Sequence, residues 1–332
     1  MINKYIFKTD KIFVAGANGM VGSAICRFLK NKYSEIISPA NLLITSREGL
    51  DFLDSTKVNL WFKKNKPDIV IICAAKVGGI KANKRFPYEF LIENLKIQSN
   101  IIDASKNFGV RRLLFLGSSC IYPKFSQQPI KEDFLLNGYL EETNQWYAIA
   151  KIAGIKLCEA IRQEYQFDAI SLMPTNLYGP NDNYDLENSH VLPALIKKFY
   201  DAKKNNLPFV KCWGSGNPLR EFLHVDDLAE ACIFALGNWN PSDINAPRDN
   251  KGKELVWLNI GSNEEISIKN LALKIASEIK YRGKVIWDTS QPDGTPRKLL
   301  DSSRIFNMGW EPKISLSVGI KRTIQNYVNE NS

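Results

Sequence analysis

The sequence predicts an α/β protein, with a main domain built on a doubly wound parallel sheet and a smaller α/β domain after it. Three observations support this class. Apolar runs alternate with helical patterns through the first half of the chain. Those runs lack the alternation of polar residues that a half-exposed strand shows. A chain of 332 residues is also too long for one small core.

Each expected element follows from a local pattern. Apolar residues recur at helical spacing from Val21 to Leu29, and Asp54 or Ser55 offers a cap for the next helix. Strands are expected at 11–16, 41–45, 68–75, 111–118, 169–173, 209–212 and 256–261. Helices are expected at 20–32, 54–65, 87–107, 145–165, 191–204, 226–236, 267–279 and 317–328.

The regular alternation loosens after Pro174, where prolines and polar loops become more frequent. We therefore expect one domain at 1–174, with returning segments near 225–261, and a second, interleaved domain at 175–332. The polar loop 238–253 is somewhat long, and we expect it to affect the rim of the second domain.

The composition is that of an ordinary globular protein, with 44% hydrophobic and 24% charged residues. The net charge of +9 is dispersed along the chain, which disfavours a nucleic-acid partner and suits small anionic ligands. Six scattered cysteines without a C-x-x-C pair predict reduced thiols, and neither disulfides nor a metal site. No apolar stretch has membrane-spanning length and no signal peptide is evident, so we expect a cytoplasmic protein without a membrane partner.

A glycine-rich loop follows the first expected strand and leads into the first expected helix. Its glycines, Gly16, Gly19 and Gly22, allow a tight turn, close approach of a pyrophosphate and close helix packing. An ordinary glycine-rich turn is the alternative. The pattern predicts a dinucleotide-binding Rossmann domain. The residues expected to bind the cofactor here are Gly16, Ala17, Asn18, Gly19, Met20, Val21 and Gly22.

The end of the second strand indicates which dinucleotide binds. NAD-binding domains usually carry an acid at this point for the ribose 2′-hydroxyl. This chain has Thr45, Ser46 and Arg47 instead. An arginine suits a 2′-phosphate, so we expect NADP (NADPH) rather than NAD, unless Arg47 is simply a solvated loop residue.

Tyr147 and Lys151 are spaced to share one face of the expected helix 145–165. A nearby ammonium stabilises a phenolate, so we expect it to lower the pKa of Tyr147. The phenol can then exchange a proton with a carbonyl oxygen during hydride transfer. Ser118, at the end of the fourth strand, is expected to hydrogen-bond that oxygen.

Seven longer motifs carry a resemblance to a known family. They are AAKVGGI (74–80), LGSSCIYP (116–123), YAIAKIAGIKLCE (147–159), MPTNLYGPNDN (173–183), NSHVLPALI (188–196), WGSGNPLREFLHVDDLA (213–229) and PDGTPRKLLD (292–301). With the glycine loop, they resemble the extended short-chain dehydrogenases/reductases and, within them, the GDP-L-fucose synthase family. The resemblance covers nearly the whole chain. It implies NADPH-dependent conversion of GDP-4-keto-6-deoxy-D-mannose by epimerisation at C-3 and C-5 and reduction at C-4.

The resemblance also implies an acid and a base for the two epimerisations, Cys120 and His190. A thiol pKa falls near a cation, and an imidazole exchanges protons at neutral pH, so the pair suits this chemistry. The alternatives are a packed Cys120 thiol and a His190 that caps a helix or lies in a core. We assign His224, which precedes two acids at the start of a helix, to structure.

Further contacts follow from the same resemblance. It implies cofactor contacts for Leu116, Gly117, Ser119, Lys151, Pro174, Thr175, Asn176, Leu177 and His190. It implies contacts to the GDP moiety for Lys198, Trp213, Arg220, Asp293 and Lys298. Two positions depart from the family. Asn18 stands where some relatives carry arginine, and Lys198 stands where an arginine is frequent, so the charge remains but the bidentate fork is lost.

Two other functions stay open. One is a nucleotide-sugar epimerase or a plain 4-reductase in which Cys120 is passive. The other is a non-catalytic NADP sensor or scaffold, which would not need to keep Ser118, Tyr147 and Lys151 together. The resemblance further implies a homodimer that packs helix 145–165 and the preceding long helix into a four-helix bundle.

Overall fold

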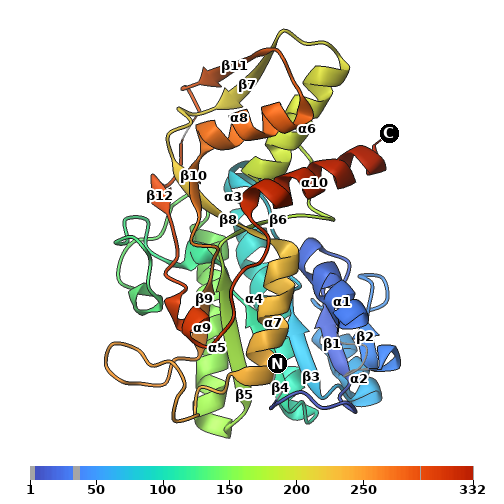
Figure 1. Cartoon of the computed structure of the whole chain (residues 1–332). Helices are drawn as coiled ribbons and strands as arrows, with labels where there is room; N and C mark the ends of the chain where they lie inside the picture. The colour runs from blue at the N-terminus through green and yellow to red at the C-terminus, as the bar shows by residue number, and fades with distance from the viewer. Residues whose placement is uncertain (1–3, 33–37, 292, 332) are drawn as a thin grey trace.

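The computed structural model describes residues 4–32, 38–291 and 293–331. Its main element is a six-stranded parallel sheet with the strand order β2-β1-β3-β4-β5-β9 (Figure 1). The strands of this sheet are β1 (Ile12–Ala15), β2 (Leu42–Ile44), β3 (Ile69–Ile72), β4 (Arg112–Leu116), β5 (Asp168–Pro174) and β9 (Trp257–Ile260). The predicted doubly wound α/β class is therefore confirmed.

Helices cover both faces of the sheet. On one face α1 packs against α7, and on the other α4 packs against both α2 and α5 (Figure 1). Their bounds are α1 (Met20–Lys32), α2 (Ser55–Asn65), α4 (Pro87–Asn107), α5 (Gln145–Tyr165) and α7 (Val225–Asn238). The predicted cap of α2 is present, because the Asp54 side chain accepts a hydrogen bond from the backbone N–H of Lys57 at 3.1 Å.

The central strands are apolar because both of their faces are covered. Every residue of β1, β3, β4 and β9 is buried, which explains the absence of polar alternation in the sequence. The sheet reverses its direction of growth between β1 and β3. Ligands of doubly wound sheets bind at such a reversal, beyond the carboxyl ends of the strands.

The second half of the chain adds smaller sheets and three helices above the carboxyl edge of the main sheet (Figure 1). The strands are β6 (Asn176–Tyr178), β7 (Phe209–Trp213), β8 (Leu219–His224), β10 (Glu265–Ser267), β11 (Lys284–Asp288) and β12 (Arg297–Lys298). The helices are α6 (Val191–Lys204), α8 (Ile268–Ile279) and α10 (Leu316–Glu330). Two short helices, α3 (Ile80–Arg85) and α9 (Ser303–Asn307), lie in connections.

Two separate buried clusters support a division into two domains. One surrounds the six-stranded sheet, and the other joins residues of α6, α8, α10 and β7. Strand β9 and helix α7 belong to the first cluster although they come late in the chain. We propose the two interleaved domains expected from the sequence on this basis. Among the residues described, no helix has the length and apolar character needed to cross a bilayer.

The expectation for loop 238–253 was wrong. None of its residues, all of which the structure describes, lines the cavity described below. The loop instead packs against the main domain, where the Asn250 N–H donates to Asp133 and Lys253 pairs with Glu159, both at 2.8 Å. The loop therefore lies on the outer surface of the sheet domain, away from the rim of the second domain.

Candidate active site

A cavity of about 980 Å³ lies between the carboxyl edge of the parallel sheet and the elements of the second half. Ligand pockets usually have volumes of roughly 300–1,000 Å³. Every residue that the sequence analysis proposed for catalysis, cofactor or substrate lines this cavity, with one exception. Ala17 belongs to the buried core of the main domain and is 6% exposed. Its contact with the cofactor stays a prediction.

The glycine loop forms a tight cradle at the start of α1. Gly16 has a φ of +89°, and a Cβ there would lie 2.7 Å from the backbone nitrogen of Ala74. A Cβ on Gly22 would lie 2.1 Å from the carbonyl oxygen of Gly16, so only glycine lets the helix start this close to the turn. The exposed Asn18 and Gly19 leave the helix N-terminus open to the cavity. This cradle fits a dinucleotide pyrophosphate.

The end of β2 has the chemistry expected for a 2′-phosphate. Arg47 is exposed and lines the cavity, and the Thr45 hydroxyl is buried without a hydrogen-bond partner in the part of the chain that the structure describes. The carboxylate that also borders this end of the cavity is Asp51, which accepts a hydrogen bond from the backbone N–H of Leu53. An arginine beside an unsatisfied hydroxyl fits a phosphate better than a ribose diol.

Ser118 and Cys120 follow β4 in a short 3-10 turn. The Ser118 hydroxyl accepts a hydrogen bond from the backbone N–H of Cys120 at 3.4 Å, which sets the turn. Gly117 before it is required by a close approach, since a Cβ there would lie 2.3 Å from the sulfur of Met173. The Cys120 thiol is 8% exposed, and burial raises its pKa despite the opposing charges of Lys298 and Lys151.

Tyr147 and Lys151 both face the cavity from the first half of α5, as their spacing predicted. The Lys151 ammonium donates to the carbonyl oxygen of Leu116 at 2.8 Å and lies 5.7 Å from the centre of the Tyr147 ring. Burial lowers the pKa of Lys151 to about 8, with Cys120 and Cys73 opposing the shift. Burial also raises the pKa of Tyr147.

These directions correct two expectations about protonation. The sequence predicts that nearby cations lower the pKa of Tyr147 and of the Cys120 thiol. Burial outweighs the charges of Lys298 and Lys151 at Cys120, whereas at Tyr147 burial and then the charge of Cys120 both raise the pKa. His190 lines the same cavity, just before α6. Burial, followed by the charge of Lys298, lowers its pKa. At neutral pH the thiol and the phenol are therefore protonated, and the imidazole is uncharged.

His224 has the structural role expected of it. It ends β8, is 1% exposed, and its Nδ1 accepts a hydrogen bond from the backbone N–H of Asp226 at the start of α7. By contrast, the His190 side chain makes no capping hydrogen bond to α6, although His190 occupies the cap position. His224 therefore has a structural role, whereas the His190 side chain lines the cavity.

The wall of the cavity that the second half of the chain forms is basic. Lys198, Trp213, Arg220 and Lys298 line the cavity from α6, β7, β8 and β12. Burial lowers the pKa of Lys298, and the charge of Arg220 adds to this effect. Asp293 is held by Ser215, whose N–H and hydroxyl donate to its two oxygens at 2.7 and 2.8 Å. Burial lowers the pKa of Arg220, and the charge of Asp293 opposes this shift.

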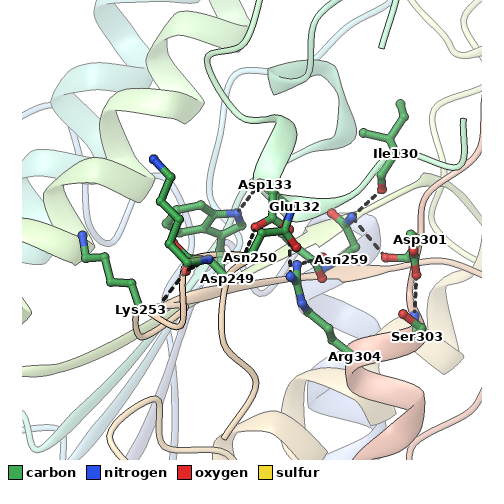
Figure 2. Close-up of polar contacts among 12 residues, drawn as sticks. Ile130, Glu132, Asp133, Asp249, Asn250, Lys253, Asn259, Asp301, Ser303 and Arg304 are labelled. Carbon is green, nitrogen blue, oxygen red and sulfur yellow. Dashed lines mark hydrogen bonds and ion pairs between the residues drawn. The ribbon is translucent and has the colours of Figure 1, made fainter. Parts of the chain in front are cut away.

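A buried polar network holds the segment that follows Cys120. The Tyr122 hydroxyl donates to the Asn259 side-chain oxygen at 2.6 Å, and the Asn259 N–H donates to Glu132 at 3.0 Å. Figure 2 shows how the Asn259 amide also bonds the carbonyl oxygens of Ile130 and Asp301. Arg304 pairs with Glu132 and with Asp133 in the same view. The network joins the segment after β4 to β9 and α9, behind the catalytic loop.

The structure places further residues in the cavity that sequence reasoning missed. Lys76 lines it after β3 and pairs with Glu89 and Glu93 of α4. Lys81 of α3 and Trp287 of β11 also line it. Both lysines belong to the sequence AAKVGGIK (74–81), but nothing in its spacing indicates that their side chains reach the cavity.

The sequence profile of the NAD dependent epimerase/dehydratase family matches residues 12–246, more than half of the chain. The chain belongs to this family. Among its relatives, a putative GDP-L-fucose synthase 2 of Arabidopsis thaliana is 52% identical, with 97% of this chain and 92% of the relative aligned. The GDP-L-fucose synthase of Escherichia coli is 48% identical, over 95% of this chain and 96% of the relative. The resemblance expected from the motifs is confirmed.

A solved structure supports the fold of this epimerase/dehydratase family member. The NADP-bound GDP-mannoheptose C4 reductase of Campylobacter jejuni superimposes with a TM-score of 0.86. It is 33% identical, and the match covers 97% of this chain and 99% of that one.

Proposed function

We propose that the protein converts GDP-4-keto-6-deoxy-D-mannose to GDP-L-fucose with NADPH, by epimerisation at C-3 and C-5 and reduction at C-4. One observation carries the proposal: Cys120 and His190 line the same cavity as Ser118, Tyr147 and Lys151. A plain reductase needs only Ser118, Tyr147 and Lys151. The close relatives named GDP-L-fucose synthase support the same reaction.

Different residues bind different parts of the cofactor. The glycine loop presents the open N-terminus of α1 to the pyrophosphate, and Arg47 with Thr45 receives the 2′-phosphate. Pro174 at the end of β5 and Leu177 in β6 line the same cavity as Tyr147. When bound, NADPH supplies the hydride for C-4.

Tyr147 supplies the proton that the C-4 oxygen gains during reduction. Its phenol is protonated in the resting site, and Ser118 can donate a second hydrogen bond to the same oxygen. Lys151, fixed on the carbonyl oxygen of Leu116, holds a positive charge beside the phenol below pH about 8. That charge stabilises the phenolate left after the proton has moved.

Cys120 and His190 supply the proton exchange at C-3 and C-5. In their resting forms the thiol carries a proton and the imidazole has a free nitrogen. The pair therefore contains one donor and one acceptor, which is what inversion through an enolate requires. One group removes the proton on one face of the sugar, and the other returns a proton on the opposite face.

The proposal extends to location and assembly. Six free thiols suit the reducing cytoplasm, where we place the reaction. We also propose a homodimer formed by α4 and α5, because Trp146, Ile149 and Leu157 of α5 are all exposed large apolar residues. Their spacing puts them on one helix face.

Deuterium incorporation tests the function. The purified protein is incubated with GDP-4-keto-6-deoxy-D-mannose and NADPH in deuterated water, and the product is weighed after return to ordinary water. Two retained deuteriums are expected, one at C-3 and one at C-5. The Tyr147→Phe variant is the control. It should exchange both positions of the unreduced keto sugar, which is weighed while still in deuterated water, and it should consume little NADPH.

A plain 4-reductase is the second candidate, and its support is the structural similarity to the Campylobacter C4 reductase. NADPH consumption without retained deuterium would establish it and leave Cys120 as a packed thiol. NADPH binding without turnover on a keto sugar would instead indicate a sensor.

A further inference from the structure

Trp213 stands at the cavity rim with two lysine ammonium groups over its ring. The indole, at the end of β7, is 42% exposed. The Lys198 nitrogen, from α6, lies 5.2 Å from the ring centre. The Lys81 nitrogen, from α3, lies 4.4 Å from it. A tryptophan face attracts cations, so each ammonium has a favourable position there. The two positive charges nevertheless repel each other across the same ring.

Helix α3 carries Lys81 from the sheet domain into the second half of the molecule. The backbone N–H of Gly79 donates to the carbonyl oxygen of Asn188 at 2.8 Å, which fixes the start of the helix. A Cβ on Gly294 would contact both the Arg220 guanidinium, at 3.6 Å, and the Ile80 side chain, at 3.9 Å. The start of α3 therefore lies beside Arg220, and Lys81 follows directly.

In the part of the chain that the structure describes, this basic cluster has no carboxylate within ion-pair distance. Lys81, Lys198, Arg220 and Lys298 form no ion pair with any Asp or Glu among residues 4–32, 38–291 and 293–331. The Lys198 nitrogen donates to the carbonyl oxygen of Lys211 at 3.1 Å. Burial lowers the pKa of Lys198, and the charge of Lys81 adds to this shift. The charges of Asp293 and Glu141 act on Arg220 from beyond ion-pair distance. Cations that border one cavity without a carboxylate in contact attract a polyanionic ligand.

We infer that Lys81 is a further substrate-binding residue, which together with Lys198 holds the diphosphate of a nucleoside diphosphate sugar beside Trp213. This inference rests on the proposed function for its choice of substrate class. A single lysine offers a point charge without the bidentate fork of arginine. Two lysines from different helices restore two donors, and each can bind a different phosphate group. Lys81 also links the diphosphate to the sheet domain.

The test compares binding of GDP and guanosine, measured by calorimetry, to the full chain and its variants. Lys81→Met removes the charge and keeps the length of the side chain. GDP should bind about tenfold more weakly, because a charge-assisted hydrogen bond is lost, while guanosine binding stays unchanged. Lys81→Arg should restore GDP binding. The GDP defect of Lys81→Met should shrink as salt screens the charge.

Lys84→Met is the matched control. Lys84 is an exposed lysine on the same helix and does not line the cavity. It should bind GDP as the unmodified chain does. Equal weakening of GDP and guanosine by Lys81→Met, or no weakening of either, would overturn the inference.

UDP and ADP distinguish the inference from the proposed function. If the unmodified chain binds UDP or ADP in preference to GDP, and Lys81→Met weakens that binding, then Lys81 holds a diphosphate and the GDP-sugar function is wrong. A chain that binds none of the three nucleotides would overturn the Lys81 assignment itself.

Discussion

At the residue scale, the protonation of the active site is set by burial more than by nearby charge. Cys120, Tyr147 and Lys151 lie together, and each is shifted toward its uncharged form. An ion in a low-dielectric site loses hydration that one neighbouring charge does not replace. The site therefore holds protons on its acids before substrate enters, which suits a reaction that moves protons at three positions of one sugar.

Replacement of Cys120 separates the two halves of the reaction. Cys120→Ala should reduce deuterium incorporation at C-3 and C-5 by roughly 10²–10⁴-fold, the usual contribution of a positioned acid or base. NADPH binding should be unchanged, as titration by fluorescence would show. Cys26→Ser, at a buried thiol outside the cavity, is the control and should exchange normally. Normal exchange by Cys120→Ala would contradict its role.

The buried Lys151 should make stability depend on pH. Its pKa falls from 10.5 to about 8 on folding, so between these values the unfolded chain binds the extra proton. Stability from this group therefore rises with pH across that window. The measurement is the free energy of unfolding in urea. From pH 8 to 10.5, this free energy should rise by up to about 3 kcal/mol more in the unmodified chain than in Lys151→Met. A difference that stays constant with pH would show that Lys151 is not desolvated.

At the element scale, the short turn after β4 depends on partners distant in the chain. Tyr122, two residues beyond Cys120, is 3% exposed, and its hydroxyl reaches Asn259 on β9. The Glu132 carboxylate accepts from the Asn259 backbone and pairs with Arg304 (Figure 2). A buried network of this kind is stable only when each member has its partners. It fixes the loop that carries the thiol.

Removal of one hydroxyl tests that network. Tyr122→Phe leaves the Asn259 side-chain oxygen buried without its donor, which should cost about 1–3 kcal/mol of unfolding free energy. The measurement is equilibrium unfolding in urea. Tyr139→Phe is the matched control, because Tyr139 is 95% exposed, and it should leave stability unchanged. Equal stability of both variants would mean that the hydrogen bond contributes nothing net.

At the scale of the whole molecule, α4 and α5 form the outer layer on one side of the sheet (Figure 1). One face of α5 carries Trp146, Ile149 and Leu157, which are 38%, 39% and 36% exposed. The interior of α5 is already packed by Ile155 and Cys158, so this outer face does not serve the chain's own core. A second copy would bury it.

The proposed dimer gives a mass twice that of the chain in light scattering. Ile149→Glu puts a charge into the apolar face and should shift the population to monomer. Leu273→Glu, at a 48% exposed leucine of α8, should leave the dimer intact. Monomeric unmodified protein, or loss of the dimer in Leu273→Glu alone, would exclude the α5 face.

The elements of the main sheet could be predicted because their patterns are local. Strands β3 and β4 are buried on both faces, which requires continuous apolar runs. The turn at Gly16 has a positive φ, which requires glycine. The short strands β10, β11 and β12 could not be predicted in this way. They have two to five residues, they are partly exposed, and what defines them is pairing with distant strands.

By itself, the sequence determined the class of the sheet, the cofactor loop, the Tyr147–Lys151 face and the family motifs, because spacing along one element carries each of them. Only the tertiary structure decided that burial keeps the Cys120 thiol protonated and that Lys81 reaches Trp213. Desolvation and the approach of distant side chains depend on what the whole chain packs around a group. No spacing within one segment contains that information.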